Sequence, residues 1–223
     1  IYYINKIKMI KIAPSILAAD LMNMKEEIEL VDKYGAELIH IDVMDGQYVE
    51  NIAFGPNIVK SLRPITKKIL DVHLMITPVA KYIDAFIEAG ADIISFHPDA
   101  DKNTQDIIKQ IKSNNCKIGI AVHPKINIRD IEIFLDDIDC VVVMTVVPGF
   151  GGQKFMHSEV KKITELDNIK KQKNLKFEIE VDGGINHETA KICRDKNANV
   201  LVAGSYIFSN GKENYEKMIN SLR

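Results

Sequence analysis

Residues 24–42 read MKEEIELVDKYGAELIHID and join an amphipathic segment to a short apolar run. Ile28 and Val31 recur at helical spacing, and Gly35 marks the end of the predicted helix. The run at 38–42 lacks a clean polar alternation, which is typical of a strand in a parallel sheet that is covered on both faces. This stretch therefore predicts one helix followed by one buried parallel strand.

The same two-part pattern recurs along the chain. Further amphipathic segments are predicted at 79–89, 102–114 and 158–170. Buried strands are predicted at 11–15, 38–42, 68–73, 93–97, 117–122, 140–145, 177–182 and 200–203. Eight such units predict an α/β protein built as a single (β/α)8 TIM barrel. An open doubly wound sheet is the alternative, and it is disfavoured because the first turn, at 15–20, lacks the Gly-x-Gly-x-x-Gly pattern of that fold.

Length and charge limit the classes of function. A chain of 223 residues with 46% hydrophobic residues can bury one large core, and we expect one domain over residues 9–223. The net charge of −2 argues against nucleic acid and against an anionic membrane as partners. No apolar stretch is long enough to span a bilayer. Residues 1–8 are interpreted as an N-terminal extension or a remnant of expression.

Three cysteines bear on the cellular compartment. Cys116, Cys140 and Cys193 are widely spaced, form no Cys-x-x-Cys pair and are odd in number, so a disulfide framework is not expected. A reducing, cytoplasmic setting is therefore predicted.

Four polar residues stand where apolar runs are expected to end. They are His40, Asp42, His73 and Asp182. His40 and Asp42 are two apart, so they project to the same face of their strand. Because the strand ends of a barrel converge on one mouth, residues far apart in the sequence can form one site. Two imidazoles and two carboxylates suit one divalent ion, Zn²⁺, Fe²⁺, Mn²⁺ or Co²⁺, with Zn²⁺ or Fe²⁺ favoured.

Glycine-rich loops follow the last three predicted strands, and the first of them reads PGFGGQ at 148–153. Their residues are Gly149, Gly151, Gly152, Gly183, Gly184, Gly204 and Ser205. Glycine lets backbone amides approach an anion closely, and barrels often bind phosphate beside strands seven and eight. A lone glycine pair is more often a tight turn, but three such loops at neighbouring strands predict a phosphate-ester ligand.

Taken in order, five short motifs resemble the ribulose-phosphate 3-epimerase family over about residues 10–208. They are APSIL at 13–17, HIDVMDG at 40–46, DVHLM at 71–75, VPGFGGQ at 147–153 and VDGGI at 181–185. The resemblance implies a barrel of the ribulose-phosphate-binding type. It also implies a metal-dependent isomerase that interconverts D-ribulose 5-phosphate and D-xylulose 5-phosphate in the pentose phosphate pathway, and a homo-oligomer.

By this resemblance, the four polar residues ligate the metal, and Asp42 and Asp182 also serve as the acid/base pair. Inverting C3 of a 2-ketose takes a proton from one face of the carbon and returns one to the other, through a 2,3-enediolate, so two groups must flank the carbon. Besides the glycine-loop residues, the expected substrate-binding positions are Ser15, Met44, His73, Met75 and Met144. Structural roles are expected instead for Asp45, His97, His123, His157 and His187.

The chain departs from the family pattern at three positions. Glu50 replaces a usual Pro, and His123 and Val147 each replace a common Asn. Substrate preference is therefore open, and D-allulose-6-phosphate 3-epimerase is an alternative activity.

Three other functions remain as alternatives. A barrel decarboxylase is disfavoured because its Asp-x-Lys-x-x-Asp strand is replaced by DVHLMI at 71–76. A metal-dependent hydrolase is disfavoured because the three methionines named above would not give an attacking water a polar shell. The third is a non-catalytic sugar-phosphate-binding barrel, which would need the glycine loops but not both Asp42 and Asp182.

Overall fold

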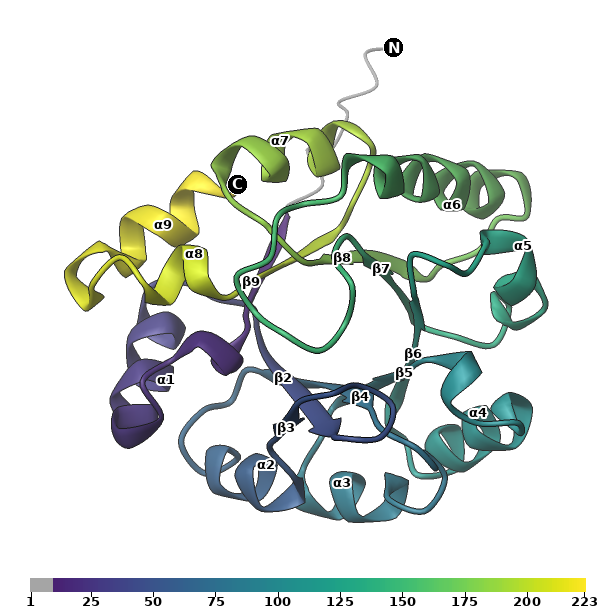
Figure 1. The fold of residues 1–223 in the computed structure, drawn as a ribbon, viewed down its shortest axis with the longest axis horizontal. Helices are drawn as coiled ribbons and strands as arrows, with labels where there is room; N and C mark the ends of the chain where they lie inside the picture. Colours follow the sequence, from purple (N-terminus) through teal and green to yellow (C-terminus); the bar gives the residue numbers. More distant parts are fainter. Residues whose placement is uncertain (1–9) are drawn as a thin grey trace, which may run out of the picture.

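A computed structural model describes residues 10–223, in which eight parallel strands form a barrel ringed by helices (Figure 1). The parallel strands are β1 (Lys11–Pro14), β2 (Leu38–Asp45), β4 (Ile69–Met75), β5 (Ile93–Phe96), β6 (Lys117–Val122), β7 (Cys140–Met144), β8 (Glu178–Asp182) and β9 (Val200–Ala203). Pairing runs from β1 through β9, β8, β7, β6, β5 and β4 to β2. A bridge between Ser15 and His40 closes the ring. The predicted (β/α)8 barrel is confirmed, and the prediction for residues 1–8 lies outside the described residues.

Helices cover the outside of the barrel. In the described part of the chain they are α1 (Met24–Lys33), α2 (Pro56–Leu62), α3 (Ile83–Ala89), α4 (Thr104–Ser113), α5 (Ile128–Ile131), α6 (Val160–Gln172), α7 (His187–Asp195), α8 (Ser205–Phe208) and α9 (Tyr215–Ser221). The third helix begins at Ile83 and not at residue 79 as predicted. Asp101 Oδ2 accepts a hydrogen bond from the Val79 amide and holds that segment outside the helix. Within residues 10–223, no helix combines the length and the apolar character needed to cross a membrane.

Strands β2 and β4 extend further than predicted. Their predicted ends are residues 42 and 73, whereas they run to Asp45 and Met75. The reason is that their parallel pairing continues through the apolar residues that follow the polar ones. A short strand that was not predicted, β3 (Ile52–Ala53), pairs antiparallel with the end of β2.

Side-chain alternation divides the barrel wall into an outer and an inner layer. On β2, Ile39 and Ile41 are fully buried and belong to the large core between the sheet and the helices. The residues between them face the lumen, where two smaller apolar clusters pack. These clusters consist of Ala13, Leu38, Ile93, Val200 and Val202, and of Ala121, Cys140, Val142, Met144 and Val146. His40 and Asp42 therefore lie inside the barrel.

Replacing Ile41 by Ala should destabilise the barrel. Ile41 is fully buried, and truncating such a side chain removes buried apolar surface and leaves a cavity, at a cost of about 2–5 kcal/mol. The matched control is Ile52→Ala on β3, because Ile52 is 78% exposed and its loss should change the free energy of unfolding by less than about 0.5 kcal/mol. Urea unfolding followed by circular dichroism measures both, and equal losses would contradict the assigned layers.

Candidate active site

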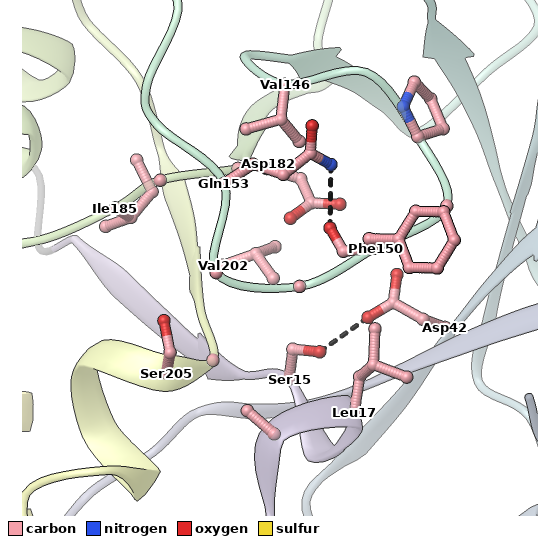
Figure 2. A pocket seen from close by; sticks show the side chains of 18 of the residues that line it. Ser15, Leu17, Asp42, Val146, Phe150, Gln153, Asp182, Ile185, Val202 and Ser205 are labelled. Carbon is pink, nitrogen blue, oxygen red and sulfur yellow. Dashed lines mark hydrogen bonds between the residues drawn. The ribbon is translucent and has the colours of Figure 1, made fainter. Parts of the chain in front are cut away.

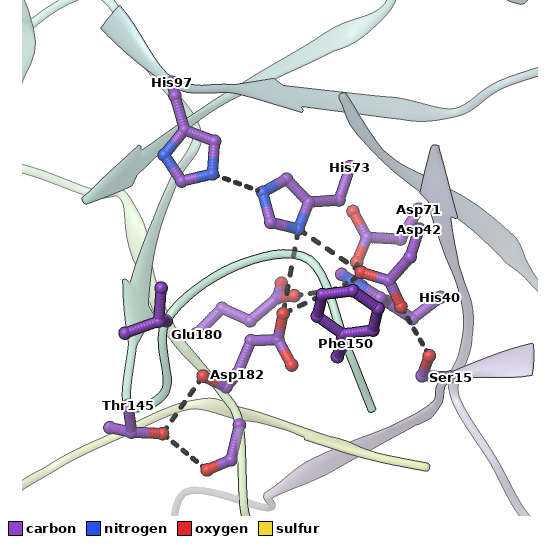
Figure 3. Close-up of polar contacts among 12 residues, drawn as sticks. Ser15, His40, Asp42, Asp71, His73, His97, Thr145, Phe150, Glu180 and Asp182 are labelled. Carbon is purple, nitrogen blue, oxygen red and sulfur yellow. Dashed lines mark hydrogen bonds and ion pairs between the residues drawn. The ribbon is translucent and has the colours of Figure 1, made fainter. Parts of the chain in front are cut away.

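The four predicted ligands lie together in the barrel lumen (Figure 3). His40 and Asp42 come from β2 and His73 from β4, and the strand register pairs Asp42 directly with His73. Asp182 is the last residue of β8. The expectation that all four end their strands is wrong for the two histidines and Asp42, because β2 and β4 run on past them. The four side chains meet in the lumen because each occupies a position of its strand whose side chain points inward.

The distances among the four side chains fit a bound divalent ion. His40 Nε2 and His73 Nδ1 each lie 3.5 Å from Asp42 Oδ1, and they lie 3.9 and 3.7 Å from Asp182 Oδ2. Ligand bonds of 2.0–2.2 Å in a tetrahedron place neighbouring ligand atoms about 3.3–3.6 Å apart. Neither ring nitrogen has a hydrogen-bond partner among the described residues. The donor atoms are therefore arranged as ligands of one ion.

The electrostatics of the cluster favour positive charge at its centre. Burial opposes the charged form of His40, but the Asp42 and Asp71 carboxylates outweigh it and hold the pKa of His40 well above its usual value. Burial likewise opposes charge on His73, and Asp182 and Asp42 raise its pKa to about 9. Burial would raise the pKa of Asp42, but the two histidines lower it below its usual value. A cation bound between these groups would meet the same attraction.

A second buried cluster lies beneath His40 and is not among the predicted site residues. Asp71 Oδ2 lies 2.6 Å from His40 Nδ1, and Glu180 Oε1 lies 3.3 Å from the same nitrogen. Burial and the Asp71 charge raise the pKa of Glu180 to about 8. Asp71 stands two residues before His73, and Glu180 stands two before Asp182. Side chains two apart on a strand point to the same face, so this spacing could have identified both carboxylates as inward-facing.

His97 supports the other histidine. It is fully buried, and its Nε2 lies 3.0 Å from His73 Nε2. Burial and the neighbouring His73 hold the pKa of His97 well below its usual value, so its ring is neutral and can accept a hydrogen bond. His97 is thus a hydrogen-bonded structural residue, as expected. His123, His157 and His187 are also expected to be structural. They lie outside the cluster of four ligands.

Asp45 fixes the loop after β2, in keeping with its expected structural role. Its Oδ1 accepts hydrogen bonds from the Gln47 and Tyr48 amides, and its Oδ2 accepts one from the Thr77 amide. The carboxylate therefore joins this loop to the end of β4.

A cavity of about 290 Å³ opens above the cluster of four ligands (Figure 2). Asp42 and Asp182 line it, whereas His40 and His73 are fully buried. The other predicted substrate-binding residues that line it are Ser15, Met44, Met75, Met144, Gly149, Gly151, Gly152, Gly183, Gly184, Gly204 and Ser205. His73 is not among the residues that line the cavity, and its contact with the substrate stays a prediction.

The cavity is lined by both apolar and polar side chains. Met44, Met75 and Met144 line it and are almost fully buried. Ser15 Oγ donates a 2.5 Å hydrogen bond to Asp42 Oδ2, which leaves Oδ1 directed at the histidines. The carboxylate of Asp42 is thereby held in one orientation.

The glycine loops also line the cavity. Gly183 and Gly184 have φ values of +119° and +65°, and a Cβ atom on them would approach Val146 to 2.5 Å and the Phe155 backbone to 2.6 Å. Only glycine fits both positions. Gln153 Nε2 closes the preceding loop by donating to the carbonyl oxygens of Val147 and Phe150.

Several lining residues were not predicted. Leu17, Phe150 and Tyr206 line the cavity. Leu17 and Phe150 stand within the APSIL and VPGFGGQ motifs, which could have marked them, whereas nothing in the sequence distinguishes Tyr206. The three departures from the family pattern, Glu50, His123 and Val147, do not line it.

Comparison with known proteins supports the predicted resemblance. Residues 11–208 match the ribulose-phosphate 3 epimerase family. The ribulose-phosphate 3-epimerase of Bacillus subtilis (strain 168) is 48% identical over 216 residues, which cover 96% of this chain and 99% of that protein. The ribulose-phosphate 3-epimerase of Escherichia coli (strain K12) is 38% identical over 218 residues, with coverage of 97% and 96%.

Solved structures share the fold at low sequence identity. The 3-keto-L-gulonate-6-phosphate decarboxylase of Vibrio cholerae superposes with a TM-score of 0.71 at 19% identity, over 96% of this chain and 95% of that chain. The 3-hexulose-6-phosphate synthase of Salmonella typhimurium gives a TM-score of 0.71 at 16% identity, over 96% of each chain. These two show the barrel fold alone. The family match over most of the chain and the relatives at 38% and 48% identity show more: the chain belongs to the ribulose-phosphate 3-epimerase family, whose members are isomerases.

Proposed function

We propose that this chain interconverts D-ribulose 5-phosphate and D-xylulose 5-phosphate by moving a proton at C3, as a step of the pentose phosphate pathway. The observation that carries the proposal is the pair of carboxylates on one cavity floor. Asp42 and Asp182 both line the cavity and come from β2 and β8, which β9 and β1 separate around the ring. Two groups that flank one carbon are what an inversion requires.

The two aspartates exchange protons with C3 from opposite faces. One carboxyl begins ionised and removes the proton, and the other begins protonated and returns one to the opposite face. Their roles reverse with the direction of the reaction. Since an ordinary aspartate has a pKa of about 3.9 and is a weak base for a C–H bond, the charge that develops on the substrate must be stabilised by other groups.

A divalent ion held by His40, Asp42, His73 and Asp182, with Zn²⁺ or Fe²⁺ favoured over Mn²⁺ or Co²⁺, would supply a positive charge that stabilises the developing 2,3-enediolate. Ser15 keeps the Asp42 carboxylate in place through its hydrogen bond to Oδ2. The methionine side chains exclude water from the reacting carbon and offer it no strong hydrogen-bond donor.

The phosphate of the substrate is proposed to lie against the glycine loops. Gly149, Gly152, Gly183 and Gly184 all adopt positive φ and line the cavity. Without a Cβ atom their backbone lets an anion approach the amide groups closely. We assign Gly204 and Ser205, which line the same cavity, to this end of the site as well.

Two properties of the protein are inferred from its sequence and family. The three cysteines are free and buried, which agrees with the inferred reducing, cytoplasmic setting. A homo-oligomer is inferred from the family resemblance, and light scattering after size exclusion would measure its mass.

Asp182→Asn should abolish conversion of ribulose 5-phosphate to xylulose 5-phosphate. An amide cannot remove or return the proton, and the loss of one positioned acid/base group costs about 10²–10⁴-fold in rate. NMR of ribulose 5-phosphate in D₂O measures both the appearance of xylulose 5-phosphate and the exchange of the C3 proton with solvent. The control is Asp106→Asn, because Asp106 pairs with Lys109 on the exposed surface, and it should form xylulose 5-phosphate at the parental rate. Conversion by Asp182→Asn at the parental rate would contradict the dicarboxylate mechanism, and binding without exchange by the parental chain would favour a non-catalytic barrel.

Removing divalent ions with a chelator should stop the same exchange reaction. Adding back Zn²⁺, Fe²⁺, Mn²⁺ or Co²⁺ singly should restore it, and elemental analysis should find about one divalent ion per chain. Parental exchange rates in demonstrably metal-free protein would contradict a role for the ion.

Initial rates should be higher with ribulose 5-phosphate than with allulose 6-phosphate. The relatives at 38% and 48% identity carry the ribulose-phosphate name, and the three departures from the family pattern do not line the cavity. The two ketose phosphates would be compared at equal concentration with the same metal-loaded protein. A higher rate with the six-carbon substrate would assign the chain to the alternative activity.

A further inference from the structure

Inside the barrel, one of the four ligands, His40, also meets two carboxylates from two other strands (Figure 3). His40 comes from β2, Asp71 from β4 and Glu180 from β8, and each is at most 1% exposed. Asp71 Oδ2 lies 2.6 Å from His40 Nδ1, and Glu180 Oε1 lies 3.3 Å from it. Both carboxylates therefore approach the ring nitrogen that faces away from Asp42 and Asp182.

The spacing of this inner group indicates a hydrogen bond and not a second metal site. Two ligands of one ion with bonds of 2.0–2.2 Å lie about 3.3–3.6 Å apart in a tetrahedron. The 2.6 Å contact between His40 Nδ1 and Asp71 Oδ2 is too short for that arrangement. It is the usual length of a charge-assisted hydrogen bond.

The hydrogen bond determines which nitrogen of His40 is free to ligate. His40 Nε2 points at Asp42 and Asp182, so a neutral ring that ligates through Nε2 carries its proton on Nδ1. That proton is donated to Asp71. A carboxylate partner fixes both the ring orientation and the tautomer and makes the ligating nitrogen more basic.

Glu180 is oriented toward the same histidine. Its Oε2 accepts a hydrogen bond from Cys140 Sγ at 3.6 Å, which leaves Oε1 facing His40 Nδ1. A second buried carboxylate beside the first is unfavourable for folding unless a positive group compensates it. The described residues place only His40, together with whatever cation it binds, in that position.

We propose that Asp71 and Glu180 are positioning residues that hold His40 in its ligating tautomer and orientation and thereby set how tightly the chain retains its divalent ion. The inference deepens the proposed function, because it rests on the metal site described there. It gives the two histidine ligands different supports, since the distal nitrogen of His73 meets the neutral ring of His97 and no carboxylate.

The test is a Co²⁺ titration of metal-free protein in the presence of a competing chelator, read by the visible absorption of the bound ion. Asp71→Asn and Glu180→Gln keep the size of each side chain and replace its carboxyl group by an amide. Each should raise the dissociation constant of Co²⁺ by about 10–100-fold, the usual effect of losing such a partner.

The matched control is Glu178→Gln. Glu178 lies on the same strand, two residues before Glu180, and pairs with Lys11 at 2.8 Å, away from the ligands. Removing its charge should leave the dissociation constant within about twofold of the parental value, because a partly exposed ion pair contributes little. A loss of affinity confined to the two inner variants would support the proposal.

The melting temperature of each metal-free variant separates positioning from a merely structural role. Positioning predicts weaker Co²⁺ binding by a protein that still folds, whereas lower stability with parental affinity in the folded fraction would overturn the proposal. If Asp71→Asn does not fold, Glu180→Gln decides alone. A parental chain that binds no Co²⁺ would refute the metal site itself, and parental binding that both substitutions leave unchanged would refute only this inference.

Discussion

Strict alternation along buried parallel strands is the constraint on which this structure depends. Ile39 and Ile41 must face the helices to complete the outer core, so His40 and Asp42 face the lumen. Because the period is two, a slip of one residue would exchange the two sets and leave charged groups against the apolar helices. The packing that stabilises the fold and the orientation of the site are therefore determined by the same register, and neither can change without the other.

Burying these polar and charged side chains in the lumen is electrostatically unfavourable. Histidines and carboxylates that water cannot reach are unfavourable unless they compensate one another. Here each imidazole has a partner on the side away from the four-ligand cluster, Asp71 for His40 and His97 for His73. The apolar residues of the outer core and of the two lumen clusters supply the stability that offsets the buried charge.

The barrel could be predicted from the sequence because its strands are short apolar runs and its helices are amphipathic. The cluster of His40, Asp42, His73 and Asp182 could be predicted because polar residues stand out in such runs. The ends of β2 and β4 could not, since Val43 and Leu74 read equally as strand or as loop. Asp71 and Glu180 share the signal that identified the ligands, but a carboxylate next to an apolar residue is also typical of a solvated strand face. Only the closed ring shows that both of them face inward.

The closing bridge between Ser15 and His40 has a consequence for biosynthesis. Strand β1 must pair with β9 on one side and with β2 on the other, so the ring needs strands from both ends of the described chain. A ribosome releases the two histidines early and Asp182 late. The nascent chain therefore has no complete ligand set until β8 emerges and no enclosed lumen until β9 follows. An ion that needs all four of the proposed ligands would therefore bind only late in synthesis.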